Sequence, residues 1–205
     1  MNASLPFSLQ PFGGEAERKD LGLESLSFSG EAALERLGSA AILRVDYRVV
    51  ADPGDTPQAI RLPAPAAAPA RRDGLWQHTC LEAFVADGDS QAYWELNLAP
   101  SGDWALYRFT GYRAGQESPP EEALPFTITR RADGLALQLH WPLPTELASA
   151  AELRLGIAAV MEQRNGALSY WALHHPGPQA DFHRRDGFSL RWPANGDCAS
   201  PPPHR

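Results

Sequence analysis

Apolar and polar residues alternate with a period of two in several short segments, and this pattern most constrains the fold. In the clearest segment, residues 43–49, the four odd-numbered positions are apolar and the three even-numbered positions are charged. Residues 26–29 and 126–129 alternate in a similar way. Because successive side chains of a strand point to opposite faces, these segments predict strands with one buried face and one solvated face.

Turn-forming residues between such segments predict antiparallel hairpins. The dipeptide Asn165-Gly166 tolerates the left-handed conformation, and we expect it to form a two-residue turn. The segment Ala132-Asp133-Gly134 indicates another turn. The expected strand pairs are residues 126–129 with 135–141, 153–161 with 169–175, and 79–86 with 93–99, followed by a strand over 104–112.

Many short strands separated by frequent turns predict an all-β protein, with an antiparallel β-sandwich or jelly roll as its architecture. Only residues 31–37 and 145–151 have short helical patterns, so one or two short helices are expected. We expect residues 1–192 to form a single domain. Residues 51–74 are rich in Pro and Ala and predict a long loop, and the Pro-rich segment 193–205 predicts a disordered tail.

The net charge and the cysteine content limit the binding partners and the cellular compartment that can be expected. The formal net charge of −7 argues against non-specific nucleic-acid binding and against anionic membrane surfaces. No run of about 18 apolar residues is present, and the first residues lack the pattern of a signal peptide. Cys80 and Cys198 form no disulfide framework and no zinc spacing. These features predict a cytoplasmic, reduced protein, and they leave its oligomeric state open.

A carboxylate in an apolar strand is the first candidate for a functional site. Glu82 shares a strand face with Cys80 and Phe84, and burying a carboxylate without a partner costs several kcal/mol. We therefore expect Glu82 to be mostly buried and paired. Arg108, on a strand predicted nearby, is the expected cation.

Glu95 and Asn97 share a face of the strand that returns from Glu82. The expected hairpin register places Glu95 or Leu96 opposite Glu82. Three interpretations are open: a Glu–Arg ion pair that orders the sheet, a polar patch that binds hydroxyl groups or Ca²⁺, and a carboxylate pair for general acid–base chemistry as in glycoside hydrolysis. Any two glutamates on neighbouring strands satisfy the last pattern, so its specificity is low.

Six tryptophans are many for this length. Aromatic faces stack on sugar rings, although core packing is the ordinary role of buried tryptophans. Trp94 and Trp141 fall on apolar faces and are expected in the core. Trp76 follows the long loop and Trp104 follows a turn, so these two are expected to be exposed. We predict that Trp76 or Trp171 lines an open pocket together with Glu82, Glu95 or Asn97.

The histidines cluster late in the chain. His174 and His175 point to opposite faces of a strand, so they are not expected to share one metal. A metal site of His183, Asp181 and one of this pair is an alternative, although the metal is unknown. The more ordinary interpretation is that Asp181 caps a turn and that His183 is hydrogen-bonded to backbone.

In combination, these segments resemble the bacterial DOMON-like proteins, whose sandwich is similar to that of family 9 carbohydrate-binding modules. Residues 75–188 carry the resemblance. The segments concerned are Leu75–Phe84, Tyr93–Asn97, Trp104–Tyr107, Tyr112-Arg113, Tyr170–His175 and Asp181–His183.

The resemblance implies a β-sandwich whose relatives bind sugars or haem through one end or face. Family 9 modules hold a terminal sugar between aromatic rings and polar side chains, often near structural calcium. On this chain it implies Trp76 and Trp171 as stacking residues, with polar contacts from Glu82, Glu95 and Asn97. Haem-binding DOMON domains use axial Met or His ligands. Haem is disfavoured because Met161 falls on a core-like face.

We therefore expect a small-molecule-binding sandwich with a carbohydrate or sugar-derived ligand, without a cofactor, and with Ca²⁺ as an alternative. The second interpretation is a structural or interaction module without a small ligand, and the third is a hydrolase or metal-dependent enzyme. The candidate ligand-binding residues are Trp76, Glu82, Glu95, Asn97, Trp104, Arg108, Trp171, His175 and His183.

Overall fold

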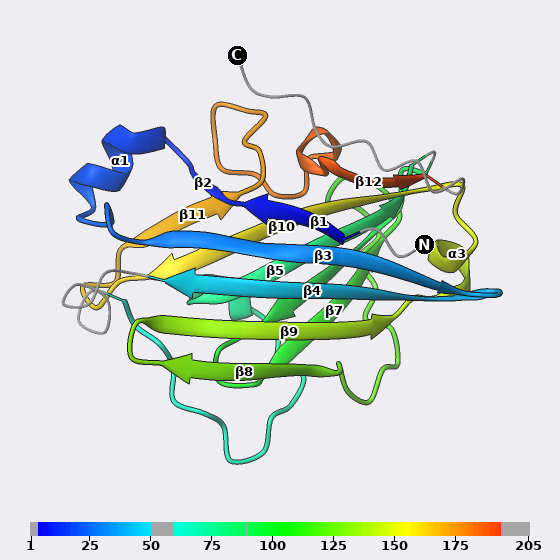
Figure 1. The fold of residues 1–205 in the computed structure, drawn as a ribbon, viewed down its shortest axis with the longest axis horizontal. Helices are drawn as coiled ribbons and strands as arrows, with labels where there is room; N and C mark the ends of the chain where they lie inside the picture. The colour runs from blue at the N-terminus through cyan, green and yellow to red at the C-terminus, as the bar shows by residue number, and fades with distance from the viewer. Residues whose placement is uncertain (1–3, 51–59, 89, 194–205) are drawn as a thin grey trace.

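The computed structural model describes residues 4–50, 60–88 and 90–193. Part of the predicted loop (residues 51–59) and the predicted tail beyond residue 193, including Cys198, lie outside the described residues. Two antiparallel sheets pack face to face as a β-sandwich, which confirms the predicted fold class (Figure 1). No helix in the described residues is long and apolar enough to cross a membrane.

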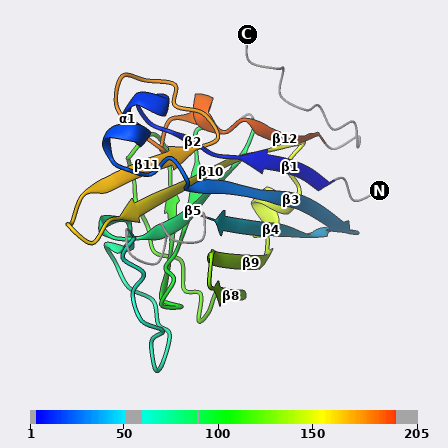
Figure 2. The same ribbon diagram turned by 60° about the vertical axis from the view of Figure 1, so that its left-hand side comes forward.

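In the described part of the chain, the first sheet, called sheet A here, has five strands and the second, sheet B, has seven. The order in sheet A is β1 (Ser4–Ser8), β3 (Ser27–Leu37), β4 (Ala40–Val50), β9 (Gly134–Pro142) and β8 (Phe126–Arg131). The order in sheet B is β2 (Gln10–Pro11), β11 (Leu168–Ala172), β10 (Glu152–Glu162), β5 (Cys80–Asp87), β6 (Tyr93–Leu98) and β7 (Trp104–Phe109), and β12 (Leu190–Pro193) also pairs with β10. Figure 2 shows the two layers from the side.

Short helical segments lie at the margins of the sandwich. In the residues that the structure describes, the α-helices are α1 (Gly14–Asp20) and α3 (Thr145–Ala148), and the 3₁₀ turns are η1 (Leu75–Gln77) and η2 (Arg185–Gly187). The helix predicted at residues 145–151 is therefore shorter than expected. The helix predicted at residues 31–37 is wrong, because Ala32 and Leu34 alternate with more exposed neighbours inside β3 and pack into the core.

The two sheets differ in how their outer faces are used. In sheet A the outer face is solvated, so β4 shows the predicted alternation of buried and more exposed residues. In sheet B the strands β5 and β6 are buried on both faces almost throughout. Leu81, Ala83 and Val85 join the core between the sheets, whereas Phe84 and Ala86 belong to a second apolar cluster on the outer face. Sheet B is therefore covered on its outer side as well.

The hairpin between β10 and β11 forms as predicted, but its turn differs. The amide of Gln163 donates to the carbonyl of Ala167 at 2.8 Å, which leaves three residues, 164–166, in the loop. The amide of Gly166 donates to the carbonyl of Gln163 at 2.9 Å, and Gly166 has a φ of +87°. The turn is thus centred on Arg164 and Asn165, with the glycine in the left-handed position that follows it.

Candidate functional site

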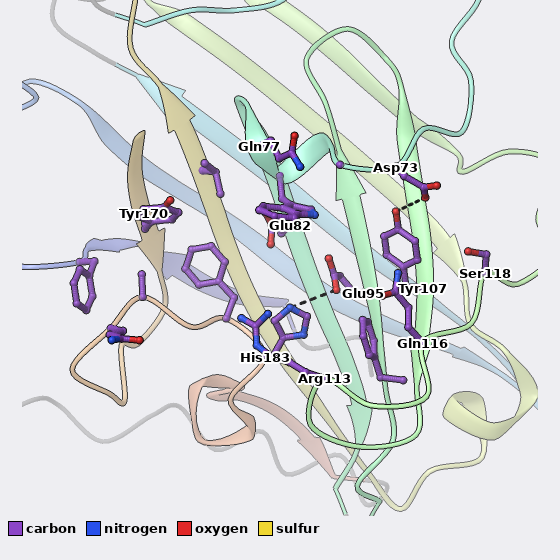
Figure 3. Close-up of a pocket in the computed structure, with 18 of the residues that line it drawn as sticks. Asp73, Gln77, Glu82, Glu95, Tyr107, Arg113, Gln116, Ser118, Tyr170 and His183 are labelled. Atoms are coloured by element: carbon purple, nitrogen blue, oxygen red, sulfur yellow. Dashed lines mark hydrogen bonds and ion pairs between the residues drawn. The ribbon is translucent and has the colours of Figure 1, made fainter. Parts of the chain in front are cut away.

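An open cavity of about 1150 Å³ lies on the outer face of sheet B (Figure 3). Strands of sheet B supply its floor, three loop segments form its walls, and the chain near α1 closes one side. The strands contribute Glu82, Glu95, Tyr107, Phe109, Val160 and Tyr170. The first wall segment contributes Asp73, Gly74, Trp76 and Gln77, the second Arg113, Gln116 and Ser118, and the third Pro178, Gln179, Ala180, Phe182 and His183. Phe12 and Glu17 line the side near α1.

Glu82 lies on the floor of this cavity and is only 3% exposed, which confirms the predicted burial. Its Oε1 has no hydrogen-bond partner among the described residues. Burial, together with the nearby charge of Glu95, raises the pKa of the Glu82 carboxyl well above its usual range. The floor of the cavity therefore holds an acidic group with one buried oxygen, Oε1, that the described residues leave without a hydrogen bond.

The predicted partner of Glu82 is wrong. Arg108 alternates with Tyr107 and Phe109 along β7, so its side chain points to the face of sheet B opposite to the cavity. Its Nε donates to Oε1 of Glu146 at 3.0 Å, in the turn of helix α3. The ion pair with Glu146 ties β7 to α3 and contributes nothing to the cavity.

Glu95 is the second buried acid of the floor, at 5% exposure. The register pairs Glu82 with Asn97 and Phe84 with Glu95, so the two glutamates are diagonal neighbours, and the predicted register is wrong. The Nδ2 of Asn97 donates to Oε1 of Glu95 at 2.6 Å. Burial raises the pKa of Glu95 to about 7 despite this hydrogen bond. Asn97, a predicted binding residue, is fully buried and is not among the residues that line the cavity, so its side chain contacts Glu95 instead.

His183 faces the same floor from a wall loop. Its Nδ1 is 2.7 Å from the hydroxyl of Tyr93, and its Nε2 is 3.9 Å from Oε2 of Glu95. Its ring packs edge-on against Phe84. Burial, and then the charge of Arg113, lower the pKa of His183 to about 4, so the imidazole is neutral near neutral pH.

The turn that carries His183 is capped as predicted, because the amide of His183 donates to Oδ1 of Asp181 at 3.2 Å. The side chain of His183, however, contacts the Tyr93 hydroxyl rather than backbone.

Arg113 is a cavity residue that the sequence analysis did not select. It adopts a left-handed φ of +50°, and its Nη2 donates to Oδ1 of Asp181 at 2.9 Å. Its charge opposes the rise of the pKa of Glu82 and of Glu95. On the far side of the floor, the hydroxyl of Tyr107 donates to Oδ1 of Asp73 at 2.6 Å. Figure 3 shows His183 on one side of Glu95 and Tyr107 on the other, with Asp73 beyond Tyr107.

The rim of the cavity is aromatic. Trp76 in η1 is 52% exposed and lines the cavity with Glu82 and Glu95, in the arrangement that the sequence analysis predicted for it. Tyr170 and Phe182 line the opposite side and lie 6.2 Å apart between ring centroids. The binding role of these residues stays a prediction.

Three further predicted residues do not line the cavity. Trp171 is 2% exposed and packs in the core on Phe28, at 4.6 Å between ring centroids, because its position in β11 faces sheet A. Trp104 is also buried, beneath the guanidinium of Arg71. His175 is held away by a hydrogen bond of its Nε2 with the carbonyl of Gln10, at 2.9 Å.

Among the described residues, no group of three or more His, Cys, Asp or Glu side chains is arranged to hold an ion. The predicted alternative with His183 and Asp181 fails because both are engaged: Asp181 accepts hydrogen bonds from Arg113 and from the hydroxyl of Tyr112, and His183 contacts Tyr93.

Comparisons with known proteins bear on the fold. No family profile matches the sequence, and no curated protein matches it significantly. The chain is similar to the crystal structure of a candidate carbohydrate-binding protein from Bacteroides uniformis, with a TM-score of 0.58 and 11% identity, over 91% of this chain and 84% of that one. At this low identity, the similarity shows a shared β-sandwich fold.

Two structures of a family 9 carbohydrate-binding module from Caldicellulosiruptor kristjanssonii were also found. The complex with cellotriose has a TM-score of 0.39 and 13% identity, and covers 74% of this chain and 68% of that one. The complex with glucose has a TM-score of 0.39 and 12% identity, and covers 74% and 69%.

Proposed function

We propose that the cavity on sheet B binds a carbohydrate or a sugar-derived small molecule. The observation that carries this proposal is the combination, in one open cavity, of the exposed indole of Trp76 with buried polar groups at Glu82 and Glu95. A sugar ring offers apolar C–H faces for stacking and a rim of hydroxyls for directional hydrogen bonds, so it needs both kinds of contact. A DOMON-like assignment and a cytoplasmic location remain proposals from the sequence.

The size of the cavity is consistent with this ligand class. Small-molecule sites commonly span roughly 300–1,000 Å³, and the cavity of about 1150 Å³ accommodates a sugar ring with a further ring or substituent. The description of the Bacteroides uniformis protein as a candidate carbohydrate-binding protein agrees with the proposal.

The proposal is tested by titrating the protein with a panel of mono- and disaccharides and following intrinsic tryptophan fluorescence and calorimetric heat. We expect one or more sugars to bind, and Trp76→Ala to weaken binding about fivefold or more, taking as a guide the roughly 1–3 kcal/mol that stacking of a nucleobase on an aromatic side chain contributes. Trp76→Phe retains an aromatic face and should lose less affinity. Unchanged binding by Trp76→Ala, or no binding by any sugar, would refute the proposal.

A second candidate is hydrolysis of a glycosidic bond. Glu82 and Glu95 lie on adjacent strands and line the same cavity, and the pKa of Glu95, raised to about 7 by burial, suits a general acid near neutral pH. Incubation with chromogenic glycosides should then release the chromophore, and Glu95→Gln should abolish the release. A protein that binds sugars but leaves every glycoside intact is a binding module and not this enzyme.

A further inference from the structure

The unpartnered carboxylate of Glu82 is the feature of the cavity that the fold itself does not explain. A buried carboxylate without hydrogen bonds is expensive, and proteins normally satisfy such groups. Glu82 is 3% exposed and is one of the residues that line the cavity, yet its buried Oε1 has no partner in the described residues. A partner that arrives with a ligand would satisfy it.

Three polar side chains around Glu82 are already engaged with other groups. On its own strand, the thiol of Cys80 donates toward Oδ1 of Asn97 at 3.5 Å. On β6, the amide nitrogen of Asn97 donates to Glu95. From sheet A, the hydroxyl of Tyr47 donates to the backbone carbonyl of Glu82 at 2.6 Å, and not to its carboxylate.

The cationic groups of the site are also committed elsewhere. The guanidinium of Arg113 is bound to Asp181 at 2.9 Å. The Nε2 of His183 lies 3.9 Å from Glu95, which is beyond hydrogen-bond distance, and its other nitrogen contacts Tyr93. No described ion pair involves Glu82. The floor therefore presents two neighbouring carboxyl groups with no cation hydrogen-bonded to either, although the charge of Arg113 acts on both from a distance.

We propose that this pair recognises a protonated amine, so that the preferred ligand is an amino sugar bound with its ammonium group at Glu82 and Glu95. The inference rests on the proposed function and narrows its ligand class. An ammonium carries up to three N–H donors and one positive charge, so it satisfies Oε1 of Glu82 and neutralises the pair in one contact. A sugar hydroxyl supplies the hydrogen bond without the charge.

The release of protons on binding distinguishes an amine ligand from a neutral sugar. Without a cation the two carboxyls, diagonal neighbours in the sheet, share a low-dielectric floor, where burial raises the pKa of each. A bound ammonium favours the ionised form, so binding near pH 6 should release protons to the buffer. Neutral sugars should bind without that release. Calorimetry in two buffers of different ionisation enthalpy measures the difference.

The experiment compares three ligands of similar shape on the wild-type protein: glucosamine, glucose and N-acetylglucosamine. Glucosamine carries the charged amine, glucose has a hydroxyl in its place, and N-acetylglucosamine has a neutral amide. We expect glucosamine to bind about 10- to 100-fold more tightly than glucose, the range supplied by a hydrogen bond to a charged group. We expect N-acetylglucosamine to lose this advantage.

Two substitutions test whether the preference for glucosamine depends on the carboxyl groups of the cavity floor. Glu82→Gln keeps the shape of the side chain but cannot ionise, so it should lower the affinity for glucosamine more than the affinity for glucose, and the ratio of the two affinities should fall. Glu31→Gln removes the same charge on sheet A, where Glu31 accepts a hydrogen bond from Ser4 far from the cavity, and should retain the preference. The wild-type ligand series does not depend on how well either variant folds.

The outcomes separate this inference from the function on which it rests. Glucose and glucosamine binding with equal affinity would overturn the amine site and leave sugar binding intact. Absence of binding by all three ligands and by the wider sugar panel would refute both. If CaCl₂ alone raises the melting temperature of the wild type but not of Glu82→Gln, the pair is a cation site for a metal, and the amine proposal is wrong.

Discussion

The neighbours Glu95 and His183 should make opposite contributions to the pH dependence of folding. Burial raises the pKa of Glu95 from its ordinary 4.5 to about 7, so the fold favours its protonated form. The stabilising contribution of Glu95 to the free energy of unfolding is therefore complete below about pH 4.5 and is lost as the pH rises through about 7. The pKa of His183 falls from 6.5 to about 4, so its contribution is complete above about pH 6.5 and is lost as the pH falls through about 4.

Each contribution is large enough to measure. Both pKa values differ from their ordinary values by about 2.5, and one pKa unit corresponds to about 1.4 kcal/mol, so each group contributes on the order of 3 kcal/mol. Between about pH 4.5 and pH 6.5 the two slopes have opposite sign, and they largely cancel in the wild-type protein. Domains have unfolding free energies of about 5–15 kcal/mol, so removal of one group should be evident.

The assay is urea unfolding followed by tryptophan fluorescence at several pH values between about 4.5 and 7. Relative to wild type, Glu95→Gln should gain stability as the pH rises across this range, because the opposing contribution of Glu95 is gone. His183→Asn should lose stability over the same range. A curve for either variant that runs parallel to that of wild type would contradict this prediction, because it would mean that folding does not displace the pKa of the residue replaced in that variant.

Three further outcomes follow from the packing. Trp171→Ala removes a core side chain and should lower the unfolding free energy by about 3–5 kcal/mol in urea titrations, whereas Trp76→Ala at the rim should change it by less than about 1 kcal/mol. Gly30→Ala should lower the melting temperature strongly, because an added Cβ would lie 1.9 Å from the carbonyl oxygen of Asp46 on the paired strand. Glu82→Gln should leave the melting temperature at neutral pH unchanged or higher, since no ion pair is broken; a fall of several degrees would contradict this.

The fold could be predicted because sheet A follows the simple period-two pattern. Strand β4 has a core on one side and water on the other, so its alternation in the sequence matches its burial in the structure. Residues 31–37 misled the helix prediction because a short stretch with Ala, Glu and Leu satisfies both periods. Its pairing with β4 along the full strand decides in favour of β3. That information is tertiary and is absent from the local sequence.

The candidate site could be predicted only in part. Glu82, Glu95 and Trp76 were selected because a carboxylate in an apolar strand and an aromatic residue after a long loop stand out locally. Trp171 was misplaced, because its side of sheet B depends on the strand register and on the core contact with Phe28. Arg113 was missed because it acts through a loop that folds over the sheet. Its left-handed φ, rare for a non-glycine residue, is visible only in the structure.

The uninterrupted burial of β5 and β6 explains why a sandwich of this kind can carry a polar cavity at all. The stability of the sandwich comes from the inner face of sheet B, where Leu81 and Leu96 are fully buried against sheet A. The outer face has a second apolar layer around Phe84, and loops cover it without filling the space above Glu82 and Glu95. The unfavourable free energy of burying Glu82 without a hydrogen bond to Oε1 thus arises on the outer face of sheet B, outside the core between the two sheets. A bound ligand of complementary charge would offset this cost, which is the physical reason behind our proposal that the cavity takes such a ligand.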